Sequence, residues 1–144
     1  MRFMVIVPAN KDSEAGILPN PEQFAEMGKF NEEMAKAGIL LAADGLQPSS
    51  KGARIKFSGT KRTVIDGPFT ESKELVAGFW IIQTKSKEEA IEWIKRAPLF
   101  DGGVEIEIRQ IFETSDFSEP VSEQMRKNEG LLGAKMAENA RRSS

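Results

Sequence analysis

Cysteine and histidine are both absent from the 144-residue chain. The absence of cysteine excludes disulfides, thiolate nucleophiles and zinc-thiolate sites, and it is compatible with a reducing compartment. The absence of histidine removes the commonest general base at neutral pH and the commonest ligand of transition metals. We therefore predict no metal site and no cofactor, and any acid–base chemistry would depend on carboxylates.

A strong net charge and a long apolar run are also missing. The net charge is −2, and lysine and arginine are mixed with acids throughout, so we predict no direct contact with nucleic acid. The opening apolar stretch, residues 3–9, is far shorter than the ~20 residues that a membrane span needs, and it lacks a signal-peptide cleavage pattern. We predict no membrane contact and a cytoplasmic location.

The apolar residues that are present, 40% of the chain, follow strand and helix patterns around a single core. Two helices are predicted, one opening at an Asn-Pro-Glu-Gln cap and one opening at a Ser-Lys-Glu-Glu capping box. The expected strands are 3–7, 39–43, 54–57, 63–65, 78–84 and 104–111, and the expected helices are 21–37 and 87–97. This order predicts an α+β fold, a ferredoxin-like split βαβ sandwich with an inserted hairpin, over residues 1–112.

The tail, residues 113–144, is polar with scattered apolar residues, and we expect a helical extension over 119–142. Two helices can cover only one face of the main sheet. Strands 3–7 and 79–82 are apolar without alternation, so the other face is apolar as well and needs a cover. The simplest cover is a second copy related by a two-fold axis, which predicts a homodimer. The alternative is that the tail helix folds over this face within one chain.

Several short motifs occur in a fixed order along residues 1–112. They are Ala37-Gly38 before an apolar segment, Gly45-Leu46-Gln47-Pro48, the stretch DGPFTESKE from Asp66 to Glu74, Gly78-Phe79, and Glu107-Ile108-Arg109. With these motifs the chain resembles the YCII-related family, in particular its DGPF branch. The resemblance implies a dimeric α+β barrel with a cavity between the sheets, and a sigma factor as a partner around transcription initiation. The family's proposed His-Asp dyad has no counterpart here, because the chain has no histidine.

The Asp-Gly-Pro-Phe segment has a structural and a functional interpretation. In the structural one, Gly67 and Pro68 shape a chain reversal that pins Phe69 into the core. In the functional one, Asp66 or Glu71 is a carboxylate base at the mouth of the cavity, with a pKa raised by nearby aromatic side chains. Ion pairing that orders the loop is the competing interpretation for Glu71.

Four further residues are candidates for ligand binding: Asp44, Lys73, Glu107 and Arg109. Glu107 and Arg109 alternate with apolar residues on strand 104–111, so they would face the partner sheet, or water if the strand is an edge. Two functions follow. One is a dimeric module that binds a small molecule or a protein partner. The other is a small cofactor-free enzyme, such as an isomerase or a proton abstractor, in which Lys73 or Arg109 holds an anion.

Overall fold

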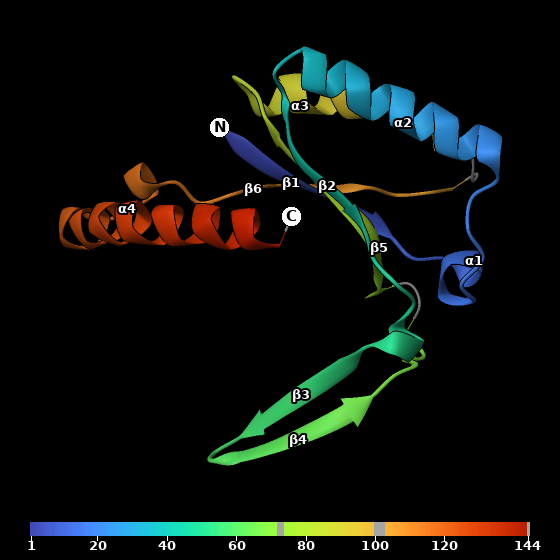
Figure 1. Ribbon diagram of the computed structural model, residues 1–144, viewed down its shortest axis with the longest axis horizontal. Coiled ribbons are helices and arrows are strands. Elements are labelled where there is room, and N and C mark those ends of the chain that lie inside the picture. Colours follow the sequence, from blue (N-terminus) through green and yellow to red (C-terminus); the bar gives the residue numbers. More distant parts are fainter. Residues whose placement is uncertain (72–73, 100–102, 144) are drawn as a thin grey trace. The chain divides into compact units, whose positions relative to one another are not determined.

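The computed structural model describes residues 1–71, 74–99 and 103–143. The chain divides into two compact units, Met1–Ile111 and Phe112–Ser144. The first unit contains a four-stranded sheet, a separate two-stranded hairpin and the helices between them (Figure 1). The second unit is mainly one long helix.

The main sheet has the strand order β2-β5-β1-β6, and all three neighbouring pairs are antiparallel. Its strands are β1 (Arg2–Pro8), β2 (Leu40–Gly45), β5 (Val76–Gln83) and β6 (Glu107–Gln110). Each helix follows one strand and leads the chain across the sheet, which places β1 and β5 in the centre. This is the split βαβ arrangement, so the predicted ferredoxin-like α+β fold is confirmed.

Helix α2 (Pro21–Lys36) begins and ends as its sequence predicts. The Gln23 backbone N–H donates to Asn20 Oδ1 at 2.8 Å, and the Asn20 N–H donates to Gln23 Oε1 at 3.2 Å. These two bonds satisfy donors that the first turn leaves free. At the other end Gly38 has a φ of 74°, the left-handed conformation that glycine adopts without strain.

Helix α3 (Lys87–Ile94) has only half of the predicted capping box. The Glu89 N–H donates to Ser86 Oγ at 3.1 Å, but the Glu89 carboxylate accepts from the Lys85 N–H, one residue earlier than expected. The helix also ends three residues before Ala97. Pro98 explains this early end, because the residue before a proline is disfavoured in the helical region.

Both helices pack on the same face of the sheet, where the core lies (Figure 1). Trp80 lies at its centre: its ring meets Phe30 edge-on with centroids 5.8 Å apart, and its indole N–H donates to Asn31 Oδ1 at 2.7 Å. The buried apolar side chains come from the two central strands, both helices and the residue after Gly38. They are Phe3, Val5, Phe30, Met34, Ile39, Trp80, Ile82, Ala90 and Ile94.

Two local predictions were wrong. No helix was expected between strand 3–7 and helix 21–37, but this segment contains the short helix α1 (Lys11–Glu14), in which Asn10 and Ser13 cap each other. Strand β6 pairs only over Glu107–Gln110 instead of 104–111. Its apolar alternation extends further because Ile106 packs against the core without pairing with β1.

The hairpin consists of β3 (Ala53–Ser58) and β4 (Lys61–Asp66), joined at Gly59 with a φ of 59°. All of its residues are exposed, and the strands pair only with each other. The 3₁₀ turn η1 (Ser49–Lys51) leads into it. A two-stranded hairpin is marginally stable by itself in water, so the anchoring at its base matters.

The second unit contains the 3₁₀ turn η3 (Thr114–Asp116) and helix α4 (Glu119–Arg142). The buried Ser122 hydroxyl donates to the backbone oxygens of Thr114 or Phe117, at 2.8 and 2.7 Å, which fixes the start of α4 against the turn. Among the residues described, no helix has the length and apolar character needed to cross a membrane.

Candidate functional site

The sheet face opposite the helices carries two rows of side chains that run across all four strands. The backbone register aligns the residues of each row, and residues directly opposite each other share a face. One row is Asp44, Phe79, Ile6 and Glu107, and the other is Ala42, Ile81, Met4 and Arg109. The centre of this open face is therefore apolar, and its two edges are charged.

Three of the predicted ligand-binding residues, Asp44, Glu107 and Arg109, lie on this open face, but they are not all together. Asp44 is on edge strand β2, whereas Glu107 and Arg109 are on the opposite edge strand, β6. Three strand spacings of about 4.8 Å separate the edges, so Asp44 lies roughly 14 Å from the other two. Arg109 Nε is 3.5 Å from Glu107 Oε2.

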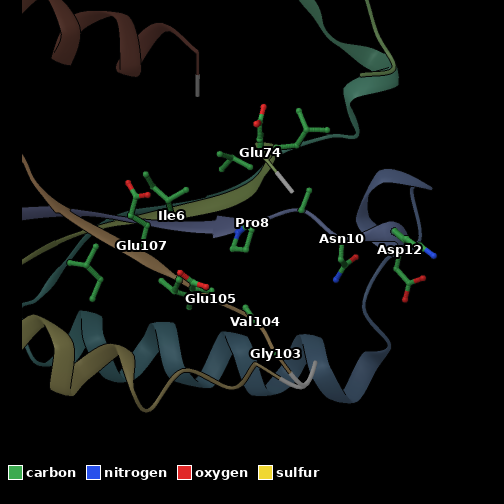
Figure 2. Close-up of a pocket in the computed structure, with 15 residues that line it drawn as sticks. Ile6, Pro8, Asn10, Asp12, Glu74, Gly103, Val104, Glu105 and Glu107 are labelled. Atoms are coloured by element: carbon green, nitrogen blue, oxygen red, sulfur yellow. The ribbon is translucent and has the colours of Figure 1, made fainter. Parts of the chain in front are cut away.

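An open cleft with a volume of about 1400 Å³ lies at one end of this face, between β6 and the segment after β1. It is lined by the apolar side chains of β1, β5 and the β6 approach, and by charged residues around them (Figure 2). Its charged lining residues are Lys11, Asp12, Glu74, Glu105 and Glu107. Among the described lining residues four carboxylates face one lysine, and the potential of this part of the cleft favours cations and hydrogen-bond donors.

The carboxylates are distributed around the cleft and do not meet at one point. In Figure 2, Glu74 and Glu105 lie on either side of Pro8, and Asp12 lies at one end beside Asn10. Among the described residues, no group of three or more acidic side chains is arranged to hold a metal ion. The geometry suits an extended polar ligand that several separate carboxylates contact.

The Asp-Gly-Pro-Phe segment forms the base of the hairpin. The Gly67 N–H donates to the Gly52 carbonyl at 3.0 Å, and the Phe69 N–H donates to Ser49 Oγ at 3.0 Å. Ser49 is held in turn by Glu14, whose carboxylate accepts from the Ser49 N–H at 3.0 Å and from its hydroxyl. We call this group of five residues the neck.

Gly67 is essential to the neck for a steric reason. A Cβ at this position would overlap the Ser49 carbonyl group, so the two backbones can approach only because residue 67 has no side chain. The neck therefore supports the structural interpretation of the motif. Phe69, however, is not part of the core as predicted: it is half-buried, and the Arg54 guanidinium lies 3.9 Å above its ring centroid.

Glu71 is exposed and forms an ion pair with Arg54, at 3.4 Å between Oε2 and Nη1. A hydrogen bond from its own backbone and the Arg54 side chain lower the pKa of Glu71 from its ordinary value of 4.5. This direction is opposite to the raised pKa that a carboxylate base needs at neutral pH. It agrees with the alternative that Glu71 orders the loop.

Asp66 ends β4 opposite Ala53, and its side chain is exposed. Neither Asp66 nor Glu71 is among the described residues that line the cleft. Lys73, the remaining predicted ligand-binding residue, lies outside the described residues. The sequence candidates thus occupy three places: the cleft with the adjoining β6 edge, the opposite sheet edge, and the hairpin with its neck.

Sequence reasoning missed the contribution of the segment after β1, which supplies Asn10 and Asp12 to the cleft. The reciprocal Asn10 and Ser13 cap was a local signal for the short helix. No local signal could show that this helix lies across from Glu105, because that depends on how β1 and β6 pair. The Glu14 contact with Ser49, 35 residues away, was hidden for the same reason.

Comparisons with known proteins support the fold and leave the chemistry open. A protein described as "Uncharacterized protein R00369", from Rhizobium meliloti (strain 1021), is 30% identical over 70 residues, which cover 49% of this chain and 56% of that protein. The chain thus spans about half the length of this curated relative.

One solved structure is similar over 82% of this chain and 100% of its own chain, with 12% identity and a TM-score of 0.44. It is 5-chloro-2-hydroxyhydroquinone dehydrochlorinase from Burkholderia phenoliruptrix AC1100, in complex with 2,5-dihydroxybenzoquinone. The family model described as the YCII-related domain matches residues 1–115. This match includes the whole four-stranded sheet, both covering helices and the hairpin, and on this basis the chain belongs to the YCII-related family.

Proposed function

We propose that the protein is a cytoplasmic homodimeric module that binds a small polar molecule in the cleft beside β6. The observation that carries this proposal is the cleft itself, an open cavity with a surplus of carboxylates directly beside an apolar sheet face. Sites for small molecules are typically concave and largely apolar, with a few polar groups that fix the ligand's orientation. The cleft is concave and has apolar residues in its lining, but with five charged side chains among its described residues it is more polar than such a typical site.

The open face supports the dimer. Its central side chains, Met4, Ile6, Phe79 and Ile81, are half-buried, and none belongs to the core cluster on the helix side. Full burial of such a side chain contributes roughly 1.5 to 3 kcal/mol, so covering four of them is a substantial driving force. A second copy of the same face has the same apolar centre and charged edges, and a two-fold axis would bring them together.

The charge of the cleft indicates the class of ligand. An ionised carboxylate can accept hydrogen bonds but cannot donate them, so the ligand must supply the donors. A positive charge on the ligand would strengthen each contact. Amines and guanidines combine both properties, as the side chains of lysine and arginine do. We therefore expect an aliphatic or aromatic amine, or a guanidine, with an apolar part that contacts residues such as Ile6 and Val76.

A carboxylate-base enzyme is the competing function, and the surroundings of Glu71 provide little support for it. Glu71 has a lowered pKa and an arginine partner, which makes it a weaker base. A protein partner such as a sigma factor is a further alternative, and the first experiment distinguishes it from the small-molecule proposal.

Native mass spectrometry of the gently purified protein is that experiment. A dimer that retains extra small-molecule mass supports the proposal, and tandem fragmentation would then identify the ligand. A dimer without retained mass, and without a response to the amines below, favours a protein partner. A monomer at micromolar concentration contradicts the homodimer.

A thermal-shift series then tests the cleft. The probes are primary amines and guanidines of increasing chain length, with the matched neutral alcohols as controls. Glu105→Gln should remove most of the shift that the amines produce, because it removes a charge from the cleft lining. Glu88→Gln is the matched control, since Glu88 is exposed in the first turn of α3, outside the described cleft lining. Equal shifts in both variants would place the ligand elsewhere.

A further inference from the structure

The hairpin has one apolar face and one basic face, and both are exposed. On the first face Ile55 lies opposite Val64, and Phe57 lies opposite Arg62, whose guanidinium covers the phenyl ring at 4.4 Å. Their exposed fractions are 56% for Ile55, 69% for Phe57 and 64% for Val64. Three large apolar side chains so exposed on a single hairpin indicate a surface that a partner covers.

The second face carries three of the four basic residues of the two strands. Here Arg54 and Lys56 of β3 share a face with Lys61 of β4. Asp66 is the one acid in the two strands, and it lies at the base. The chain as a whole is acidic, with a net charge of −2, so the hairpin is a basic element on an acidic protein.

The cleft beside β6 has the complementary chemistry. Along the approach to β6, Glu105 and Glu107 alternate with Ile106 and Ile108, and Glu74 adds a further carboxylate. On β3, basic and apolar residues alternate with the same period of two. Opposite charges on adjacent strands stabilise a pairing, whereas like charges oppose it. The partner that supplies this match is a second copy of the same chain.

The dimensions are also compatible. A six-residue strand spans about 20 Å, which exceeds the ~14 Å between the outer strands of the four-stranded sheet, so a hairpin can reach across a partner's sheet. The cleft volume of about 1400 Å³ exceeds the roughly 300 to 1000 Å³ of a typical ligand pocket. It therefore has room for the end of a hairpin as well as a small ligand.

We propose that in the dimer the hairpin of each protomer lies in the cleft of its partner, where it encloses the ligand site and places Lys56 and Lys61 near Glu74 and Glu105. This inference rests on the homodimer of the proposed function and extends it, because the site is then complete only when the partner contributes the second wall.

Charge reversal tests the exchange of hairpins. One variant carries Lys56→Glu and Lys61→Glu, and a second carries Glu74→Lys and Glu105→Lys. The dimer dissociation constant of each is measured by sedimentation velocity at low salt. The matched control, Lys29→Glu with Lys87→Glu, makes the same charge change as the first variant, on exposed positions of α2 and α3. All substituted residues are exposed, and fluorescence of the buried Trp80 verifies that each variant is folded.

We expect each reversed variant to dimerise on the order of ten-fold more weakly than wild type, with the control within about two-fold. An equimolar mixture of the two reversed variants should regain wild-type affinity as a heterodimer, since each hairpin then meets a cleft of opposite charge. If both variants dimerise as the control does, or if the mixture shows no preference for the heterodimer, the hairpin exchange is wrong while the homodimer stands. A monomeric wild-type protein would overturn both.

Discussion

Replacing Gly67 with alanine is the most direct test of the neck. The new Cβ would overlap the Ser49 carbonyl oxygen and carbon, and backbone atoms cannot rotate away as a flexible side chain can. The two segments must separate, which strains or breaks the bonds from Gly67 N to Gly52 O and from Phe69 N to Ser49 Oγ, both 3.0 Å. With about 0.5 to 1.5 kcal/mol for each bond and about 1 to 3 kcal/mol for the steric overlap, we expect a loss of about 2 to 6 kcal/mol.

Urea unfolding, followed by the fluorescence of Trp80, measures this loss as a lower free energy of unfolding. Gly28→Ala is the matched control: Gly28 lies inside α2, and an added Cβ there meets nothing within 4 Å. Alanine should stabilise that position by about 0.5 to 1 kcal/mol, because it restricts the unfolded chain and favours the helix. If Gly67→Ala changes the free energy by less than about 0.5 kcal/mol, the close approach at the neck does not matter for stability and our reasoning fails.

Three further predictions concern other parts of the molecule. Asn31→Ala leaves the indole N–H of Trp80 without its acceptor and should lower the free energy of unfolding in urea by about 1 to 3 kcal/mol. Adding Trp80→Phe to this variant removes the unpaired donor and should recover part of the loss. Asn20→Ala removes the cap of α2 and should cost about 1 kcal/mol; an unchanged midpoint would show that the cap adds nothing. The lowered pKa of Glu71 stabilises the fold above pH 4.5, and this contribution is lost as the pH falls through the folded pKa. The difference in the free energy of unfolding between wild type and Glu71→Gln should therefore shrink between pH 6 and pH 3. Arg54→Gln should weaken this pH dependence. Curves of free energy against pH that run parallel for wild type and Glu71→Gln would contradict the role of the ion pair.

The sequence predicted those features that depend on local signals. The cap at Asn20, the stop at Gly38 and the apolar strands predicted the order of elements, and this order is enough to identify the split βαβ fold. Local signals failed where distant segments compete. Strand β6 begins at Glu107 and not at Val104, because pairing with β1 and not alternation decides where a strand starts.

The candidate site was less predictable, since a cleft is formed by the register between strands. Glu107 and Arg109 were found through their alternation with isoleucines, and the register places them on the open face as expected if the apolar side meets the helices. Asp44 lies on the opposite edge, which a single sequence cannot show. The role of Gly67 depends on the backbone of Ser49, 18 positions earlier, so the sequence left a structural and a functional interpretation of the motif open, and the geometry supports the structural one. The homodimer, the DGPF branch and the sigma-factor partner stay predictions.

Hydrogen exchange in the exposed hairpin can also show whether another surface contacts it. Its backbone amides are protected from hydrogen exchange only by the ladder between its own two six-residue strands, whereas the amides of β1 and β5 are released only when the core opens. Exchange of the hairpin amides therefore reports the free energy of opening the hairpin, and exchange in β1 and β5 reports the free energy of opening the core. Slow exchange in the hairpin with unchanged exchange in the central strands would mean that another surface covers it, and the amides that slow first would show where that surface begins.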